Sequence, residues 1–328
     1  MERRSDFTEE ARGFMKSRVV LTGAELDFFT RIDRQPCSAA EIAGESGLDL
    51  RAATRVLDCL VTYGFLRKEN GVYHLTADGA PFSSLHPETV RPMLLHMNGL
   101  WDRWSRLTDI LRQGPEAFRG TGLEMDKRDT KAFIGAMHVV GRSLSKEVAA
   151  SLDLSGFKRL LDVGGGSGTY VIAFLSGNPG MRAVIFDLEE VVSMARERLE
   201  EEGFIDRVDL VAGDFYRDEL PRGCDVALLS AIIHQNSPDQ NRVLFEKIFR
   251  ALDPGGILLV RDHIMDESRT SPPAGAVFAV NMLANTRGGD TYTFREVQEG
   301  LTAAGFTSVR LVRTGERMDS VVEGTKPA

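Results

Sequence analysis

The sequence predicts an α/β protein with a Rossmann-like, mostly parallel sheet that has helices on both faces, preceded by an α-helical winged-helix domain. After Ser151, short apolar runs such as RLLDVGG, AVIFDL and GILLVRDHI alternate with segments of helical periodicity. This alternation is typical of a parallel sheet covered on both sides. Earlier in the chain, two helical segments precede a strong hairpin signal at Asn70-Gly71. These observations divide the chain into residues 1–89, 90–150 and 151–328.

The composition restricts the classes of function. The 328 residues carry a net charge of −8, and an acidic chain lacks the field that attracts phosphate backbones, so we expect no nucleic-acid partner. The apolar runs are too short to span a bilayer, and MERRSDFTEE has no apolar signal-peptide region, so we expect no membrane partner. Three cysteines outside any CxxC pattern argue against a disulfide framework and a structural zinc site, and they indicate a reducing, cytoplasmic compartment: Cys37, Cys59 and Cys224.

The N-terminal domain begins with short amphipathic helices. Apolar residues recur at helical spacing up to Arg34, where the helix ends because Pro36 follows. Ser38, with Glu41 three residues later, predicts a capping box that opens the next helix, and Gly47 ends that helix.

A second helix and a hairpin complete a winged-helix pattern. Asp49 opens the helix, and its predicted inward residues are Ala52, Val56, Leu57 and Leu60. Alternating residues on both sides of Asn70-Gly71 then predict two strands. Winged helices often enter the major groove of DNA. Here the second helix offers only Arg51 and Arg55 as bases, offset by acidic neighbours, so packing or dimerisation is the favoured role.

The segment 90–150 is helical and rich in methionine and aromatic residues. Such helices form ordinary core, but they also line apolar ligand pockets, because methionine adapts to irregular shapes. Both interpretations stay open for Trp104 and Met137, our candidates for substrate binding in this segment. The apolar segment 274–285 predicts a further helix, whose Phe278 and Met282 are the other candidates.

The strongest motif is a glycine-rich turn between a strand and a helix, residues 161–169 (LDVGGGSGT). Gly164 and Gly166 let the backbone approach a ligand closely, and the following helix N-terminus favours negative charge. A dinucleotide pyrophosphate usually takes a GxGxxG loop. The GxGxG spacing here favours the small zwitterionic tail of S-adenosylmethionine.

Acidic residues end the next two strands. Asp187 follows the second strand, where a carboxylate binds both hydroxyls of a ribose. Asp214 and Phe215 follow the third strand, where a carboxylate accepts from the adenine amine and an aromatic ring packs on the base. Three successive strand ends therefore fit an adenosine-bearing cofactor, and the alternative is that these are ordinary surface turns.

A histidine and an aspartate end the following strands. The fourth strand is predicted over residues 225–233 and ends in His234, a candidate general base. The fifth strand ends in Asp262, and neighbouring parallel strands place both residues at one edge. Asp262 would accept from one imidazole nitrogen and leave the other free to take a proton. His263 is expected to point to the opposite face in a structural role, and it is the alternative base if the register differs.

From these motifs, the chain resembles the S-adenosylmethionine-dependent small-molecule O-methyltransferases. That family includes plant caffeate and flavonoid enzymes, acetylserotonin methyltransferase and bacterial polyketide-tailoring enzymes. LDVGGGSGTY, FDLEEV and AGDFY are similar to its cofactor motifs, and the interval from Asp225 to His234 is similar to the approach to its catalytic histidine. The N-terminal winged helix is similar to its dimerisation domain, and WSRLTDIL and the segment around Met137 resemble its substrate-cavity helices.

The resemblance implies that His234 deprotonates a hydroxyl of the acceptor while the methyl group transfers from sulfur. It also implies that S-adenosylmethionine is held by Gly164, Asp187, Asp214 and Phe215, and that the chain forms a homodimer through its N-terminal domain.

The sequence departs from the family pattern at the site. Ser230 stands where the family has a lysine that contacts the cofactor, and we count Ser230 among the cofactor-binding positions. Asp262 stands where the family has a glutamate. Thr291 stands where the family has a second orienting glutamate, and Asp290 beside it is the candidate replacement.

Rival interpretations remain. The missing second glutamate leaves open a C- or N-methyltransferase, or a relative that uses the cofactor for another reaction. A winged-helix regulator that senses S-adenosylmethionine belongs to a different class, and sparse basic residues disfavour it. A metal-dependent mechanism needs an oxygen-rich cluster near the fourth strand, where only Asp239 is found, so we expect no metal.

Overall fold

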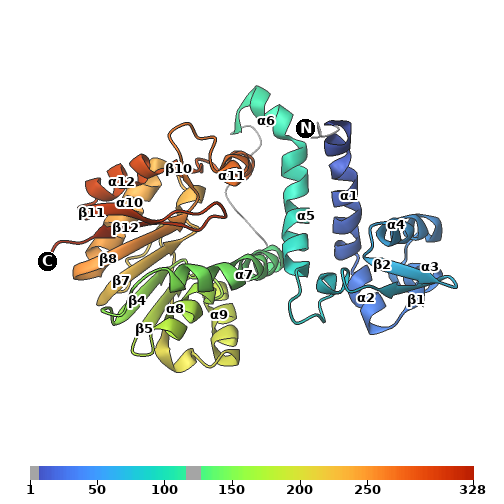
Figure 1. Cartoon of the computed structure of the whole chain (residues 1–328), viewed down its shortest axis with the longest axis horizontal. Coiled ribbons are helices and arrows are strands. Elements are labelled where there is room, and N and C mark those ends of the chain that lie inside the picture. The colour runs from blue at the N-terminus through green and yellow to red at the C-terminus, as the bar shows by residue number, and fades with distance from the viewer. Residues whose placement is uncertain (1–6, 116–126) are drawn as a thin grey trace, which may run out of the picture. The chain divides into compact units, whose positions relative to one another are not determined.

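A computed structural model describes residues 7–115 and 127–328 of the chain. They form two compact units: residues 7–101 with 127–139, and residues 102–115 with 140–328. The helices α5 (Arg91–Ser105) and α7 (Lys127–Ala150) each contribute to both units (Figure 1). Each unit is described by itself below.

The first unit has the winged-helix order that the sequence predicts. Besides parts of α5 and α7, its elements are α1 (Phe7–Glu25), α2 (Phe28–Arg34), β1 (Cys37–Ser38), α3 (Ala39–Ser46), α4 (Leu50–Thr62), β2 (Leu66–Glu69), β3 (Val72–Leu75) and the 3-10 turn Ala80–Phe82. The sheet order is β1-β3-β2, with antiparallel pairing. The capping box of Ser38 and Glu41 is confirmed, as is the left-handed Gly47 that ends α3.

The hairpin and the core of this unit follow from local sequence. Asn70 and Gly71 have φ of 49° and 82°, the left-handed pair that a tight hairpin turn needs. Leu57 and Leu60 of α4 are buried as predicted. The prediction for Ala52 is wrong: it is exposed, and Ala53 is the buried alanine, because the buried face begins one residue later.

The second unit contains a seven-stranded sheet in the order β11-β12-β8-β7-β4-β5-β6. Its strands are β4 (Arg159–Val163), β5 (Arg182–Asp187), β6 (Val208–Ala212), β7 (Cys224–Ser230), β8 (Leu252–Asp262), β11 (Thr307–Arg313) and β12 (Ser320–Thr325). Strands β6, β5, β4, β7 and β8 are parallel, and β12 is antiparallel to both its neighbours. The predicted mostly parallel sheet is confirmed.

Helices cover both faces of this sheet (Figure 1). Besides parts of α5 and α7, the helices of this unit are α6 (Leu107–Gln113), α8 (Thr169–Gly177), α9 (Glu189–Glu201), α10 (Pro238–Ala251), α11 (Pro273–Asn285) and α12 (Phe294–Ala303), and it also contains a short parallel pair, β9 (Ile264–Met265) and β10 (Tyr292–Thr293). Buried residues of α10 and α12 pack on one face, and those of α7, α8 and α9 on the other. Alternation along each strand therefore assigns every strand-end side chain to one of two sides.

One predicted boundary is wrong, and it matters for the site. The fourth strand, β7, ends at Ser230 and does not run on to Ile233. Ala231 has φ of 58°, a left-handed conformation that ends the extended backbone, and a 3-10 turn over Ile233–Gln235 follows. His234 therefore stands on a turn beyond the carboxyl end of the strand.

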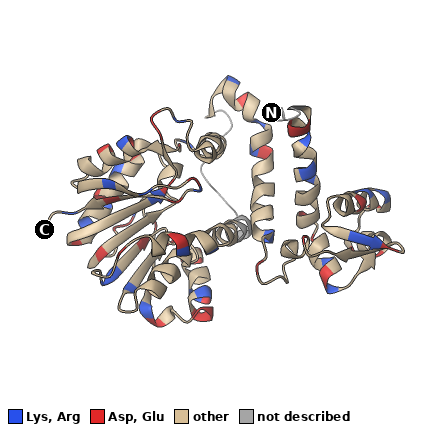
Figure 2. Cartoon of the chain, viewed as in Figure 1, with Lys and Arg blue, Asp and Glu red and all other residues tan. Residues whose placement is uncertain are grey.

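Acidic and basic residues are interspersed over the described parts of both units (Figure 2). Among the helices that the structure describes, none combines the length and the apolar character needed to cross a membrane. Within the same residues, no group of three or more His, Cys, Asp or Glu side chains is placed to hold a metal ion.

Candidate active site

The glycine-rich turn after β4 is built from left-handed glycines. Gly164, Gly166 and Gly168 have φ of 73°, 57° and 76°. A Cβ atom at Gly164 would lie 2.7 Å from Cδ1 of Ile232 and 3.3 Å from Cε1 of Phe215. Only glycine fits this position, because both the backbone conformation and the neighbouring side chains exclude a larger residue. The turn leads directly into the N-terminus of α8.

Asp187, at the end of β5, is fixed beside this turn. Its two carboxylate oxygens accept from the backbone N–H groups of Gly166 at 2.8 Å and Leu188 at 2.7 Å. Burial raises the pKa of Asp187, and these two hydrogen bonds oppose that rise. Each oxygen keeps a further lone pair. The carboxylate is thus oriented and still able to accept from two hydroxyls.

The backbone of the loop after β6 is hydrogen-bonded to a buried lysine. Nζ of Lys247, on α10, donates to the backbone carbonyls of Phe215 and Asp218, at 2.9 Å each. The backbone N–H of Asp214 donates to Asp218, and one Asp214 oxygen accepts from the N–H of Tyr216 at 2.9 Å. The predicted adenine-binding residues, Asp214 and Phe215, therefore lie on a rigid loop.

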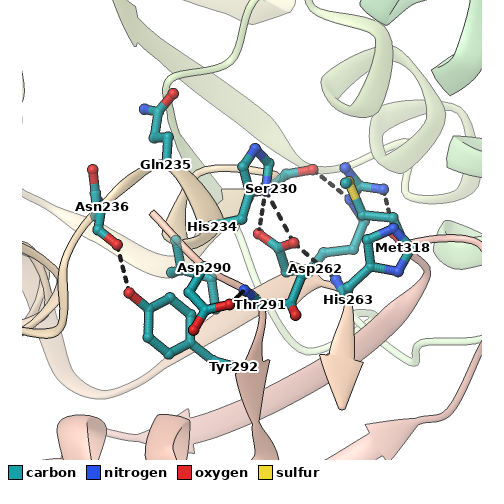
Figure 3. A network of polar contacts seen from close by, with 12 residues as sticks. Ser230, His234, Gln235, Asn236, Asp262, His263, Asp290, Thr291, Tyr292 and Met318 are labelled. Atoms are coloured by element: carbon teal, nitrogen blue, oxygen red, sulfur yellow. Dashed lines mark hydrogen bonds and ion pairs between the residues drawn. The ribbon is translucent and has the colours of Figure 1, made fainter. Parts of the chain in front are cut away.

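His234 and Asp262 form a close pair, as predicted (Figure 3). Nδ1 of His234 lies 2.9 Å from Oδ2 and 3.0 Å from Oδ1 of Asp262. Asp262 is fully buried and also accepts from the N–H of His263 at 2.8 Å. Burial alone would raise the pKa of Asp262, but the adjacent His234, its hydrogen bonds and the nearby Arg261 outweigh burial and lower that pKa.

The other imidazole nitrogen of His234, Nε2, is not used to anchor the ring. Within the described part of the chain, Nε2 makes no hydrogen bond. The ring of Phe278, on α11, stands edge-on to the imidazole at a centroid distance of 4.8 Å, and it also lies 5.3 Å from the ring of His263. His234 is thus anchored at Nδ1 and walled by an aromatic ring, with Nε2 available.

The other predicted acceptor residues are placed as follows. Nε1 of Trp104 donates to Oδ1 of Asn281 on α11 at 2.9 Å, so this indole is fixed near Phe278's helix. Met282, also on α11, is buried. Met137 lies on α7 in the first unit, and its role in acceptor binding stays a prediction.

Comparison with known proteins decides the family. A model of the O-methyltransferase domain matches residues 104–307, and a model of the O-methyltransferase dimerisation domain matches residues 8–82. The chain belongs to the O-methyltransferase family. It is an S-adenosylmethionine-dependent enzyme that acts on small molecules.

Full-length relatives agree. The O-methyltransferase is 31% identical to the tetracenomycin polyketide synthesis 8-O-methyl transferase TcmO of Streptomyces glaucescens, over 98% of this chain and 96% of the relative. It is 30% identical to the 3-hydroxy-5-methyl-1-naphthoate 3-O-methyltransferase of Streptomyces sahachiroi, over 97% and 94%. The crystal structure of human N-acetylserotonin methyltransferase with S-adenosylmethionine superposes with a TM-score of 0.83 at 25% identity, over the whole of both chains.

The cofactor fits the glycine turn of this O-methyltransferase. No protein atom lies within 4 Å of the position that a Cβ atom of Gly166 would take, so the turn is open there, and Asp187 offers acceptor lone pairs beside it. We propose that Gly164, Gly166, Asp187, Asp214 and Phe215 hold S-adenosylmethionine.

Replacing Asp187 with alanine tests this assignment. We expect the Kd for S-adenosylhomocysteine, measured by calorimetry, to rise about 10- to 100-fold, because hydrogen bonds to a charged carboxylate are lost. Asp209→Ala is the matched control, since Asp209 lies in the neighbouring strand β6 and pairs with the exposed Arg159. An unchanged Kd in the Asp187 variant would refute the ribose assignment.

Asp290 of the O-methyltransferase does not orient His234 in this structure. Its carboxylate accepts from the N–H of Thr291 at 2.8 Å and from Nη1 of Arg269 at 3.2 Å. Arg269 also donates to the carbonyl of Thr291 and pairs with Glu296. The position of the second glutamate is thus occupied by a buried threonine, and Asp262 is the carboxylate that contacts the imidazole.

Sequence reasoning gave no role to Arg261, Asp162 or Lys247 of this enzyme. All three are buried charged residues around the site. A signal existed for Arg261 and Asp162, because each is a charged residue inside an otherwise apolar strand. None existed for Lys247, because a lysine on an amphipathic helix usually faces solvent.

Proposed function

We propose that this O-methyltransferase methylates a hydroxyl group of an aromatic or polyketide-like small molecule, with His234 as the general base. One observation carries the proposal: Asp262 holds Nδ1 of His234 at 2.9 and 3.0 Å, while Nε2 makes no hydrogen bond within the described residues. An ionised Asp262 keeps the proton on Nδ1, so the lone pair is on Nε2. The imidazole can then accept a proton from an incoming hydroxyl.

The reaction needs a nucleophile, an orientation and a dry site. S-adenosylmethionine, when bound, supplies a methyl group on a positively charged sulfur. Nε2 of His234 takes the proton of the acceptor hydroxyl as its oxygen becomes nucleophilic, and Asp262 stabilises the imidazolium that forms. The edge-on ring of Phe278 helps to exclude water from the imidazole. Positioning and water exclusion account for much of the catalysis, because methyl transfer from a sulfonium is already favourable.

The acceptor class is inferred from the residues near His234 and from the relatives. Phe278, Met282 and Trp104 present flat or adaptable apolar surfaces in the second unit, which suit a planar ring system. The two Streptomyces relatives carry names of enzymes for a tetracenomycin polyketide and a naphthoate. A hydroxylated polycyclic aromatic compound is therefore the acceptor that we propose.

The test is a screen of hydroxylated naphthoates and anthraquinone-type compounds with methyl-labelled cofactor. Mass spectrometry and NMR then locate the label on the product. We expect a gain of one methyl group on a hydroxyl oxygen. A methyl group on nitrogen or carbon would instead establish the alternative that the missing second glutamate leaves open. No transfer to any acceptor, combined with salt-dependent retention on DNA, would favour the regulator.

We further propose that the chain consists of a dimerisation domain over residues 1–89, substrate-cavity helices over 90–150 and a catalytic domain over 151–328. We propose that the enzyme forms a homodimer through residues 1–89. The dimerisation-domain match supports this proposal. On α1, the apolar side chains of Phe14 and Met15 are 55% and 54% exposed, as expected for a surface that a second copy covers. Light scattering should give twice the 36.2 kDa chain mass, and a monomer at micromolar concentration would contradict the proposal.

A further inference from the structure

Arg261, at the carboxyl end of β8, carries a buried guanidinium. The residue is 5% exposed. Nε donates to Oγ of Ser230 at 2.7 Å, and Nη1 donates to the carbonyl of Met318 at 2.6 Å. The guanidinium lies 4.5 Å from the centre of the Tyr170 ring. Asp162 and Asp262 lie near enough to interact with it electrostatically, but within the described part of the chain no carboxylate forms an ion pair with it. Burying an unpaired charge is costly, so this arrangement points to an anion that is held when the site is filled.

The side chain of Arg261 leans toward the glycine turn. Arg261 is in register with Ser230 on the neighbouring strand β7, and the hydrogen bond to Ser230 brings the guanidinium over that strand. The next strand, β4, carries the turn that begins at Gly164. Alternation along the strands places Arg261, Ser230 and Asp162 on the side of the sheet that α7 and α8 cover.

A buried acid on this side also has unused hydrogen-bonding capacity. Within the described residues, Oδ1 of Asp162, at the end of β4, makes no hydrogen bond. The hydroxyl of Tyr170 on α8 is buried beside the guanidinium of Arg261, which opposes the rise in the Tyr170 pKa that burial causes. A buried cation and a buried acid therefore adjoin the glycine turn from one side. Such a set complements a small ligand that carries both charges.

We propose that Arg261 binds the carboxylate of the amino-acid tail of S-adenosylmethionine. The inference rests on the proposed binding of the ribose at Asp187, on β5. From there the tail must cross β4, toward β7, where the guanidinium of Arg261 lies two strand spacings from β5, or about 10 Å. The ammonium group of the tail is the charge that complements Asp162.

The proposal also explains the departure at Ser230. In the family resemblance this position is a lysine that contacts the cofactor. Here a small hydroxyl replaces it, and Arg261 reaches the same place from the adjacent strand. The positive charge at this edge of the sheet is therefore retained, supplied by a planar group that can bind a carboxylate through two parallel hydrogen bonds.

The test compares two ligands by calorimetry on the full chain. S-adenosylhomocysteine carries the amino-acid tail, and 5′-methylthioadenosine has the same nucleoside without it. In Arg261→Met we expect the Kd for S-adenosylhomocysteine to rise about 10- to 100-fold, because a charge-assisted hydrogen-bond pair is lost. The Kd for 5′-methylthioadenosine should change less than about threefold. Arg261→Lys keeps the charge without the planar fork, and its effect should be intermediate.

Arg313→Met is the matched control. Arg313 donates to the carbonyl and the carboxylate of Asp319, so it holds the same loop as the Arg261 bond to Met318 but does not reach Ser230. We expect its two Kd values to stay at the wild-type ratio. Equal losses for both ligands in Arg261→Met, or no loss, would overturn the proposal. Arg261→Gln, which can keep a bond to Ser230, repeats the comparison if the methionine variant does not fold. These Kd values involve no acceptor, so they are independent of the role of His234.

Discussion

His234→Gln is expected to lower turnover on a phenolic acceptor by about 10²- to 10⁴-fold, the usual contribution of a positioned general base. S-adenosylhomocysteine should bind to the variant as it does to the unchanged enzyme, because His234 stands on a turn beyond the end of β7 and is not among the residues proposed to hold the cofactor. Steady-state rates and calorimetry measure the two effects separately. Normal turnover in this variant would refute the general-base proposal.

The acidity of the acceptor gives a sharper test of the same residue. A phenol with a pKa of about 10 is mostly protonated at neutral pH and needs a base, whereas an acceptor already ionised at the assay pH does not. The defect of His234→Gln should therefore shrink as electron-withdrawing groups make the acceptor more acidic. His263→Gln serves as the comparison, since His263 packs on the same Phe278 ring. A loss confined to the His263 variant would transfer the role of base to that residue.

Asp262→Asn is expected to be almost as damaging, with a loss of up to about 10⁴-fold by analogy with the aspartate of a serine-protease triad. An asparagine amide can donate to Nδ1, which favours the tautomer that carries the proton on Nε2 and so removes the acceptor of the hydroxyl proton. Asp262→Glu places the family's residue at the position and should retain most of the activity. Full activity in the asparagine variant would show that Nδ1 needs no anion.

The lowered pKa of Asp262 fixes the sign of its pH effect. A depressed carboxyl pKa means that the group favours the folded state once pH exceeds its ordinary value near 3.8, and that this stabilisation is lost as pH falls. Thermal unfolding should therefore show that Asp262→Asn is less stable than the unchanged enzyme near neutral pH and that this difference in stability disappears in acid. In the neutral range Asp262 stays ionised, so the asparagine variant should lower the rate there at every pH.

Much of the site was predictable because parallel strands end at one edge. The alternation of apolar runs and helices located Gly164, Asp187 and Asp262, and the structure places each of them at a strand end. The pairing of His234 with Asp262 followed from the same argument and is confirmed as a contact. Local patterns that depend on neighbouring residues alone, such as the capping box at Ser38, were also correct.

The other features of the site depend on backbone conformations and on contacts between residues far apart in the sequence, which the spacing of residues along the chain does not indicate. The predicted end of β7 is wrong because Ala231 adopts a left-handed conformation, with φ of 58°. Alanine rarely adopts this conformation, so the sequence does not indicate it. Asp290 was predicted to orient His234, but its carboxylate accepts from Arg269, which is 21 residues away in the sequence. The long side chains of Arg261 and Lys247 bridge to other elements, and sequence patterns indicate the face of an element but not where a flexible side chain ends.

The placement of the proton acceptor beyond the sheet has an evolutionary consequence. His234 is carried by a short turn after Ala231, whereas the glycine turn and Asp187 are tied into the hydrogen-bonded strands β4 and β5. Ile232, Ile233 and Asn236 of this turn are buried, whereas His234 and Gln235 are only partly buried and are free of the sheet's hydrogen bonds, so these two positions can vary more readily than the strands. Descendants of this scaffold can therefore exchange one nucleophile chemistry for another by rewriting a few positions, while the machinery that delivers the methyl donor is inherited intact.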